Sequence, residues 1–321
     1  MIFEKQIVKT YQKQFASRCD DKGLAYYFSA ADFKGLSAHP YTFDNGQGQT
    51  LKGYFYHYDT PKKDRLVVFD HGFGGGHRSY MKEIEALCRG GYTVFSYDHT
   101  GCMESKGQGT CGLGRSLSDL DACFRALKQE EALKHTVFSV MGHSWGGYST
   151  MNISALHPEI AHVVVLSGFV SVKRQLECFF PKLLKWYIPA VHAFEQAQNG
   201  KYADFDGIET LKQTKAQGLL VYSENDPLVS KQMHYDPLFC ALKDRENITF
   251  LLEKNKGHNP NYTKEAVGLL AEYTNALAAK QKKKEIESDE QKRAFVSSFD
   301  FDAMTKQDEH VWQAVLKVLE K

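Results

Sequence analysis

The feature that most constrains the fold is an alternation of short apolar runs with segments of helical period. The apolar runs cover residues 65–72, 92–98, 136–144, 162–168, 218–226 and 248–254, and the helical candidates cover 78–90, 116–131, 145–157, 229–243 and 260–280. Runs that are apolar on both faces are expected where helices cover both sides of a sheet. Two earlier segments, 39–45 and 50–60, alternate apolar with polar residues around an Asn45-Gly46 turn and predict an antiparallel hairpin. The sequence therefore predicts an α/β fold with a mainly parallel sheet of about eight strands and helices on both faces.

The length of 321 residues fits one such domain with an inserted segment. We expect the core to comprise residues 39–170 and 217–280. Residues 171–216 are too many for a simple crossover and predict a helical insertion, either a lid or a cap. Residues 1–38 predict an N-terminal helical extension, and residues 281–321 a charged linker followed by a terminal helix over 300–320.

Charge and cysteine content exclude several classes of protein. Forty basic and 39 acidic residues give a formal charge of +1, so no global electrostatic attraction draws the chain toward nucleic acid or an anionic membrane. A local charged patch remains open. The N-terminus lacks the continuous apolar core of a signal peptide, and no run reaches the ~18 apolar residues of a membrane span. The seven cysteines are scattered without a metal-binding or redox spacing, which favours reduced thiols and a cytoplasmic location. The oligomeric state does not follow from the sequence.

The strongest local signal is the hexapeptide Gly142-His143-Ser144-Trp145-Gly146-Gly147, which contains the G-x-S-x-G pattern. It directly follows an apolar run and precedes a helical segment, which is the context of a nucleophile elbow. The turn would present the Ser144 hydroxyl above the sheet, and the glycines would let a neighbouring chain pass closely. The alternative is a glycine-rich strand–helix turn with an incidental serine.

A serine hydroxyl needs a base before it is a good nucleophile. Asp226 follows the run 218–226, and His258 follows the run 248–254, in the chain order Ser, Asp, His. Because the carboxyl ends of parallel strands lie at one edge of a sheet, these side chains should converge on Ser144. Glu224 is the alternative acid. His143 should point away from Ser144 and pack against or orient the elbow.

A tetrahedral intermediate also needs hydrogen-bond donors for its oxyanion. We expect the backbone N–H of Trp145 and that of Phe73, which lies in the glycine-rich loop 71–76. The alternative for this loop is a phosphate-binding turn, but it lacks the Gly-Lys-Ser/Thr ending of a nucleotide P-loop. No metal or organic cofactor is required for this chemistry.

Five motifs together resemble the α/β-hydrolases, in particular their esterase and serine-aminopeptidase-like branch: HGFGGG, YDHTG, GHSWGG, SENDPLV and GHNP. The resemblance covers roughly residues 50 to 275. It implies the α/β-hydrolase fold and two-step acyl transfer by Ser144, His258 and Asp226. Where relatives often carry Asp-x-Arg-Gly-x-Gly, this chain has Asp98-His99-Thr100-Gly101-Cys102-Met103, so the geometry of that loop should differ. Asp98 is expected to be structural.

The insertion is where substrate specificity should be determined. Its aromatic residues either attach it to the core or, in the sharper hypothesis, include Phe179, Phe180 and Trp186 as walls of an acyl or aryl pocket over Ser144. The first expected function is hydrolysis of carboxylic esters of small or medium acyl or aryl groups. An aminopeptidase-like or thioester-cleaving enzyme is the alternative. An aminopeptidase needs an acidic group to bind the substrate amine, and Glu177 and Glu195 are acidic residues of the insertion. A non-catalytic binding protein of the same fold is the remaining alternative.

Overall fold

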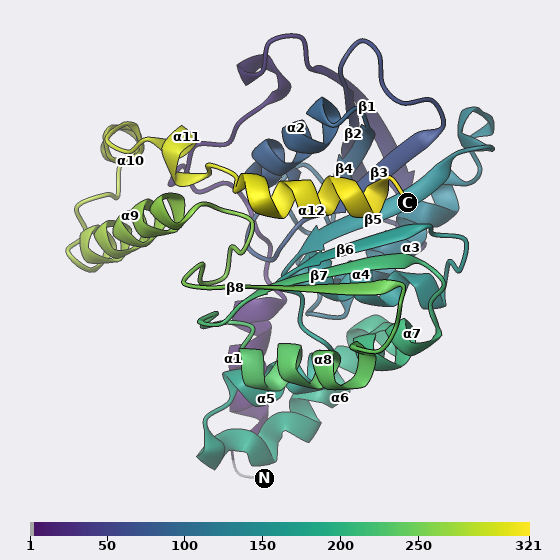
Figure 1. Cartoon of the computed structure of the whole chain (residues 1–321). Coiled ribbons are helices and arrows are strands. Elements are labelled where there is room, and N and C mark those ends of the chain that lie inside the picture. The colour runs from purple at the N-terminus through teal and green to yellow at the C-terminus, as the bar shows by residue number, and fades with distance from the viewer. Residues whose placement is uncertain (1–2) are drawn as a thin grey trace.

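The computed structural model describes residues 3–321, which form an eight-stranded sheet in the order β1-β2-β4-β3-β5-β6-β7-β8 (Figure 1). Strands β3 to β8 run parallel to one another, and the hairpin of β1 and β2 joins them antiparallel, through β4. The fold prediction is confirmed, including the number of strands. The strands are β1 (Ser37–Asp44), β2 (Thr50–His57), β3 (Arg65–Asp70), β4 (Thr93–Tyr97), β5 (Val137–His143), β6 (His162–Leu166), β7 (Gln217–Ser223) and β8 (Ile248–Glu253).

Helices precede, connect and follow these strands. Between β6 and β7 the chain forms α5, the short helical turn η5, α6 and α7, so this segment is helical as expected. The helices are α1 (Glu4–Phe15), α2 (Met81–Arg89), α3 (Arg115–Leu127), α4 (Trp145–Asn152), α5 (Val172–Phe179), η5 (Lys182–Tyr187), α6 (Ile188–Asn199), α7 (Gly207–Gln213), α8 (Asp236–Leu242), α9 (Lys264–Lys282), α10 (Asp289–Ser297), α11 (Phe301–Met304) and α12 (Glu309–Leu319).

Two apolar layers sandwich the sheet because successive strand side chains point to opposite faces. Val67 and Phe69 of β3 pack in one layer, with α2 and α12. Leu66 and Val68 pack in the other layer, with α3, α4 and α8. Helices therefore cover both faces, which is why the central strands are apolar on both sides (Figure 1).

Three helical segments differ from the sequence prediction. The helix expected over 229–243 divides into a π-helical turn and α8, and Pro237, which has no N–H to donate, stands in the first turn of α8. The helix expected over 300–320 is broken between α11 and α12, because the Lys306 carbonyl and the Asp308 N–H pair with the chain before α9. The charged stretch 281–293 contains the start of α10, where Ser288 and Gln291 form a reciprocal capping box.

Candidate active site

Ser144 lies on a strained turn between β5 and α4. Its backbone has φ 55° and ψ −108°, a conformation that costs a non-glycine residue energy. A Cβ on Gly146 would lie 2.0 Å from the Asp70 carbonyl oxygen, and a Cβ on Gly142 would lie 2.2 Å from the Gly146 carbonyl oxygen. Only glycine fits at these two positions, which explains the G-x-S-x-G spacing.

Asp226 and His258 form a hydrogen-bonded pair at the same edge of the sheet. The His258 Nδ1–H donates to Asp226 Oδ2 over 2.7 Å, and Asp226 Oδ1 accepts the N–H groups of Leu228 and Val229 at 2.8 and 2.9 Å. Burial alone would raise the pKa of Asp226, but the His258 hydrogen bond and charge and the two N–H groups together lower it. Asp226 therefore stays ionised and can orient the imidazole. Glu224, the alternative acid, is exposed.

Ser144 and His258 line the same cavity. Within residues 3–321, no hydrogen bond joins the Ser144 hydroxyl to the His258 imidazole, whose Nδ1 is bound to Asp226. Such contacts are often long in unliganded enzymes and shorten when substrate binds. The structure thus brings the three predicted side chains to one edge of the sheet and leaves the contact between nucleophile and base unformed.

His143 connects the elbow to the loop that carries His258. Its Nε2 lies 2.7 Å from the His258 carbonyl oxygen, and its Nδ1 lies 2.9 Å from the Tyr80 hydroxyl. Because a carbonyl only accepts, Nε2 carries the proton and Nδ1 accepts from Tyr80. Burial, reinforced by the charge of His258, lowers the pKa of His143 to about 3, so the ring is neutral at pH 7. Sequence reasoning missed the role of Tyr80.

The two expected oxyanion donors flank the nucleophile. The Trp145 N–H opens α4, where the first N–H groups have no partner within the helix. No described residue accepts a hydrogen bond from the Phe73 N–H, and both residues line the cavity with Ser144. The Trp145 ring is fully buried, and its indole N–H donates to the Leu113 carbonyl over 2.6 Å. The elbow is therefore fixed by a large, completely packed side chain.

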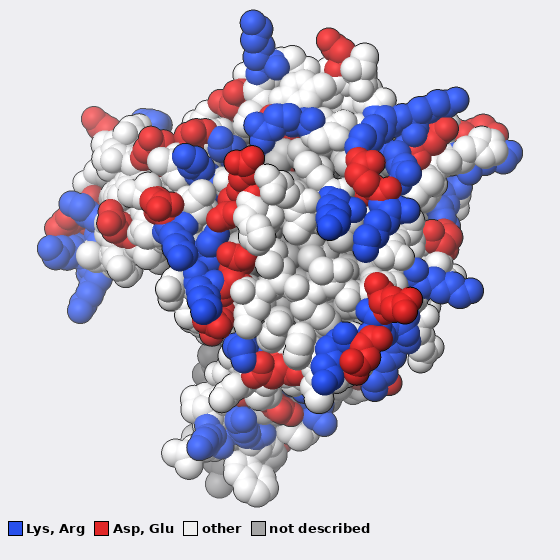
Figure 2. All heavy atoms as spheres, in the orientation of Figure 1, with Lys and Arg blue, Asp and Glu red and all other residues white. Residues whose placement is uncertain are grey.

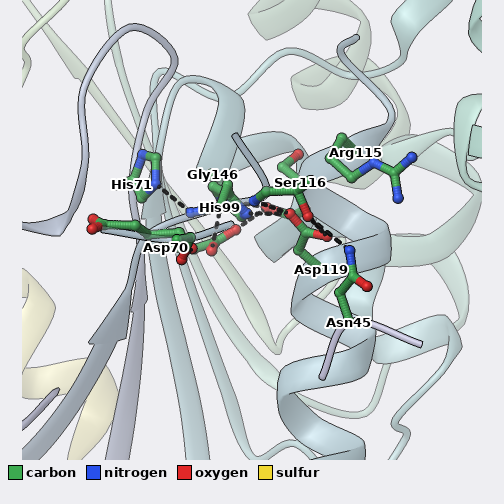
Figure 3. A network of polar contacts seen from close by, with 12 residues as sticks. Asn45, Asp70, His71, His99, Arg115, Ser116, Asp119 and Gly146 are labelled. Atoms are coloured by element: carbon green, nitrogen blue, oxygen red, sulfur yellow. Dashed lines mark hydrogen bonds and ion pairs between the residues drawn. The ribbon is translucent and has the colours of Figure 1, made fainter. Parts of the chain in front are cut away.

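A buried charged network lies next to the elbow; we call Asp70, His71, His99, Asp119 and Ser149, whose hydroxyl donates to Asp70 Oδ2, the floor network (Figure 3). The fully buried His99 ring lies between two carboxylates, with Nε2 3.1 Å from Asp70 Oδ1 and Nδ1 3.4 Å from Asp119 Oδ2. Burial opposes a charge on His99, but the two carboxylates outweigh it and raise its pKa to about 9. The two nearby carboxylates therefore favour the protonated form of His99.

The floor network also binds the loops that form the site. The His71 Nδ1–H donates to the Gly72 carbonyl over 2.8 Å, next to Phe73, and its Nε2 accepts the His99 N–H at 3.0 Å. Asp119 accepts the Thr100 N–H at 2.7 Å and the Thr100 hydroxyl at 2.9 Å, so Thr100 is bound where relatives often carry arginine. These contacts fix the backbone that carries the Phe73 N–H.

Asp98 is bound to main chain and to His77, as expected of a structural residue. Its Oδ1 accepts the N–H of His77 and lies 2.8 Å from His77 Nδ1, and its Oδ2 accepts the Glu104 N–H. Burial would raise the pKa of Asp98, but His77 and the N–H groups lower it to about 2. A Cβ on Gly76 would lie 2.3 Å from this carboxylate, so the glycine-rich loop packs directly on Asp98.

The cavity above Ser144 has a volume of about 660 Å³. Phe179 and Phe180 line it, as the sequence predicts. Trp186 does not: 76 % of its surface is exposed, and we remove it from the candidate binding residues. The cavity is lined by Ile7, Thr10, Tyr11, Gln14, Phe15, Gly72, Phe73, Tyr80, Leu113, His143, Ser144, Trp145, Phe169, Gln175, Phe179, Phe180, Pro181, Leu184, Leu228 and His258.

One wall of the cavity comes from α1, a contribution that sequence reasoning missed. Ile7, Tyr11 and Phe15 follow one another at the four-residue spacing of a helix face. Phe15 stacks on Phe179 with a centroid distance of 5.1 Å. The spacing predicts an amphipathic helix, but it does not tell where the apolar face packs.

Glu195 on α6 holds this wall in place. It is fully buried, accepts the Tyr11 hydroxyl, and accepts the N–H groups of Leu113 and Gly114 at 2.8 and 3.0 Å. The Asn199 side-chain amide donates to it as well, over 3.0 Å. Burial raises the pKa of Glu195 despite these donors. Its carboxylate is therefore occupied by the protein and is not among the groups that line the cavity.

The loop that carries His258 is anchored by the C-terminal part of the chain. Lys256 is 1 % exposed, and its ammonium group contacts the Tyr262 carbonyl and lies 2.5 Å from Asp308 Oδ2. Asp308 caps the start of α12 by accepting the His310 N–H. Burial would raise the pKa of Asp308, but Lys256 lowers it. The position of His258 thus depends on residues far beyond the predicted core.

Residues 3–321 contain no group of three His, Cys, Asp or Glu side chains that could hold a metal ion. None of the helices described there combines the length and the apolar character that crossing a bilayer requires. All seven cysteines are free thiols.

The family model described as serine aminopeptidase, S33, matches residues 61–250, which is more than half of the chain. The chain belongs to this family. The α/β-hydrolase resemblance of the sequence motifs is confirmed, and the protein is an enzyme of the α/β-hydrolase family. No curated protein matches the sequence.

Several solved structures of hydrolases are similar to this chain at low sequence identity. An esterase of Pyrococcus furiosus superposes with a TM-score of 0.59 at 18 % identity, covering 83 % of this chain and 98 % of its own. An acetyl xylan esterase of Paenibacillus sp. R4 gives 0.56 at 16 % identity, with coverages of 86 % and 93 %. An acylaminoacyl peptidase of Pyrococcus horikoshii gives 0.55 at 17 % identity, with coverages of 71 % and 39 %. At these identities the likeness supports the fold of this S33 family member.

Proposed function

We propose that the protein hydrolyses carboxylic esters of small or medium acyl or aryl groups through an acyl-enzyme at Ser144. The observation that carries this proposal is the cavity itself. It joins Ser144 and His258 to the phenylalanine side chains of α1 and α5, and none of its described lining residues is Asp, Glu, Lys or Arg. An uncharged, largely apolar cavity of about 660 Å³ suits a neutral acyl or aryl group.

In the first step, His258 Nε2 takes the Ser144 proton as the hydroxyl oxygen attacks the acyl carbon. Asp226 holds the Nδ1–H of the ring and stabilises the imidazolium that forms. The N–H groups of Phe73 and Trp145 bind the oxyanion of the tetrahedral intermediate. His258 then gives its proton to the leaving alcohol, and the acyl group remains on Ser144.

In the second step, His258 takes a proton from water, and the resulting hydroxide attacks the acyl-enzyme. The tetrahedral intermediate collapses, the carboxylic acid leaves, and the proton returns to Ser144. The link from Tyr80 through His143 to the His258 carbonyl keeps the base in place through both steps.

The aminopeptidase-like alternative needs an acidic group that binds the free amine of the substrate. Glu195 is fully buried and bound to Tyr11, Leu113 and Gly114, and Glu177 is not among the cavity-lining residues. These observations favour ester over aminoacyl substrates. A thioester substrate would use the same three side chains, so only the choice of leaving group distinguishes it.

The test compares three substrate series on the purified protein: p-nitrophenyl esters of increasing acyl length, aminoacyl p-nitroanilides and acyl-coenzyme A thioesters. We expect the largest kcat/KM with an ester of short or medium acyl length. A larger value with the anilides or with the thioesters would replace the proposed substrate class.

The role of Ser144 is tested by Ser144→Ala, which should lower kcat about 10⁴-fold or more without a change in melting temperature. A fluorophosphonate probe should label the wild type and not the variant; an unlabelled wild type would favour the non-catalytic binding protein.

Asp226→Asn should lower kcat by about 10⁴-fold, and Glu224→Gln, its matched control two residues away, should leave kcat unchanged. A larger loss of kcat in Glu224→Gln than in Asp226→Asn would assign the role of the acid to Glu224.

A further inference from the structure

Three large apolar side chains are exposed at one end of the molecule. Leu183 and Trp186 of η5 are 88 % and 76 % exposed, and Phe3, just before α1, is 63 % exposed. They are the most exposed of the large apolar residues in the part of the chain that the structure describes. We call Phe3, Leu183 and Trp186, with their flanking residues on α1 and η5, the tip.

The two segments of the tip lie together beside the cavity. Ile7, one helical turn after Phe3, and Leu184, next to Leu183, line the same cavity. In Figure 1, α1 and the region of α5 and α6 lie together at the lower end, where the N-terminus is also found. The exposed apolar side chains therefore lie close to the cavity that contains Ser144.

The tip is strongly basic although the whole chain is nearly neutral. Residues 3–13 of α1 and its N-terminal flank and residues 182–187 of η5 contain five Lys and one Glu, whereas the formal charge of the whole chain is +1. Lys5, Lys9 and Lys13 follow one another at a four-residue spacing along α1, and Lys182 and Lys185 flank the exposed Leu183 and Trp186. Figure 2 shows Lys and Arg side chains at this lower end, among uncharged surface and some Asp and Glu side chains.

Among the described residues, four lysines of the tip have no ion-pair partner. No acidic side chain among residues 3–321 lies within ion-pair distance of Lys5, Lys9, Lys182 or Lys185, whereas Arg174 has Asp206 at 3.9 Å. Unpaired lysines beside an exposed tryptophan and leucine are the combination that binds the headgroup region of an anionic bilayer. A tryptophan ring is favoured at that depth, and long lysine side chains reach outward to the phosphates.

We propose that the tip is a docking surface for an anionic lipid membrane. Leu183, Trp186 and Phe3 insert among the headgroups, and the surrounding lysines bind the lipid phosphates. The cavity beside the tip then faces the bilayer, so an ester with an apolar acyl chain can pass from the lipid into the cavity. Only this last step rests on the proposed esterase function; the docking itself does not.

The three tryptophans provide a direct probe. Trp145 and Trp312 are 0 % and 7 % exposed, so a change in tryptophan emission on contact with vesicles reports on Trp186. The test uses the Ser144→Ala protein, which cannot hydrolyse the lipid, and vesicles of phosphatidylcholine with or without phosphatidylglycerol. We expect a blue shift of the emission and co-sedimentation with the anionic vesicles, and neither with phosphatidylcholine alone.

Two variants of the Ser144→Ala protein locate the contact. Lys182→Gln with Lys185→Gln should lower the apparent affinity for anionic vesicles about 10- to 25-fold, and Leu183→Ser with Trp186→Ser should lower it about 10-fold. Lys282→Gln with Lys283→Gln, at the exposed end of α9, is the matched control and should leave the affinity within about twofold of the parent. Unchanged melting temperatures establish that the variants are folded.

Three results would overturn the proposal. The first is a tryptophan emission that does not shift on contact with anionic vesicles, and the second is equal vesicle binding by the Lys182/Lys185 and Lys282/Lys283 variants. The third is sedimentation that shows self-association lost in the Leu183/Trp186 variant, because a second copy of the chain would then cover the tip. Since binding is measured without turnover, failure of docking leaves the ester assay unaffected, and failure of the ester assay leaves docking unaffected.

Discussion

The regions below and above Ser144 are held together by different kinds of contact. Below it, the floor network buries His99 completely between the carboxylates of Asp70 and Asp119. Above it, the cavity wall is formed by aromatic side chains such as Phe15 and Phe179, which are only partly buried and meet through stacking. The floor is a set of directed polar contacts, and the wall is a set of undirected apolar ones.

This difference assigns the two parts of the reaction to different kinds of interaction. Oxyanion donors must be aimed at a fixed point, which requires a backbone held by short polar contacts. An acyl group needs only apolar volume, which partly exposed side chains can supply and can also change easily. We therefore expect substitutions in the floor to act on stability and those in the wall to act on substrate preference.

The largest effect on folding is expected for His99→Gln. This change removes the cation between two buried carboxylates and should lower the free energy of unfolding by about 3–5 kcal/mol. Urea denaturation measures it, with the exposed His310→Gln as the control that should change the free energy by less than about 0.5 kcal/mol. Equal effects of the two changes would mean that the floor does not depend on its buried charge.

The pH dependence of the free energy of unfolding is a second test of the charge on His99. The pKa of His99 is raised to about 9 in the folded state, above its unfolded value of about 6.5. Its stabilising contribution is therefore complete below pH 6.5 and is lost as the pH rises through 9. Between pH 7 and 10 the free energy of unfolding should fall by about 2–3 kcal/mol more in the wild type than in His99→Gln. Parallel pH profiles for the two proteins would show that His99 is neutral when folded.

The smallest effect on folding is expected in the wall. Phe179→Ala should lower the free energy of unfolding by only about 1–2 kcal/mol, less than the loss of a fully buried ring. The same change enlarges the cavity and should raise kcat/KM for a decanoyl ester about tenfold relative to a butyryl ester. Trp186→Ala, an exposed aromatic of the same segment, should leave that ratio unchanged. A shift with Trp186→Ala alone would place the acyl group elsewhere.

The sequence was informative wherever a residue's place follows from the end of a strand. Ser144, Asp226 and His258 each follow a strand of a parallel sheet, so their meeting at one edge could be predicted without knowing any packing. The spacing of glycines around Ser144 likewise reflects local backbone geometry.

What could not be predicted depends on contacts between distant segments. The helical spacing of apolar residues in α1 predicts the face that carries Tyr11. The hydrogen-bond partner of Tyr11, however, is Glu195 on α6, and no sequence pattern links these two residues. Trp186 was misplaced because an abundance of aromatic residues does not tell which side of a helical turn faces inward. The raised pKa of His99 also requires the approach of Asp70 and Asp119 from separate elements.

Because Asp308 anchors Lys256, the position of the His258 loop depends on a residue near the end of the chain. All five motifs end by residue 260, yet the loop that holds the imidazole is anchored by an ion pair between Lys256 and Asp308, the N-cap residue of α12. A nascent chain that ends after the last motif therefore lacks the partner of Lys256. We expect a protease that cut before Asp308 to lower the rate of hydrolysis at a distance, with the serine and its turn untouched.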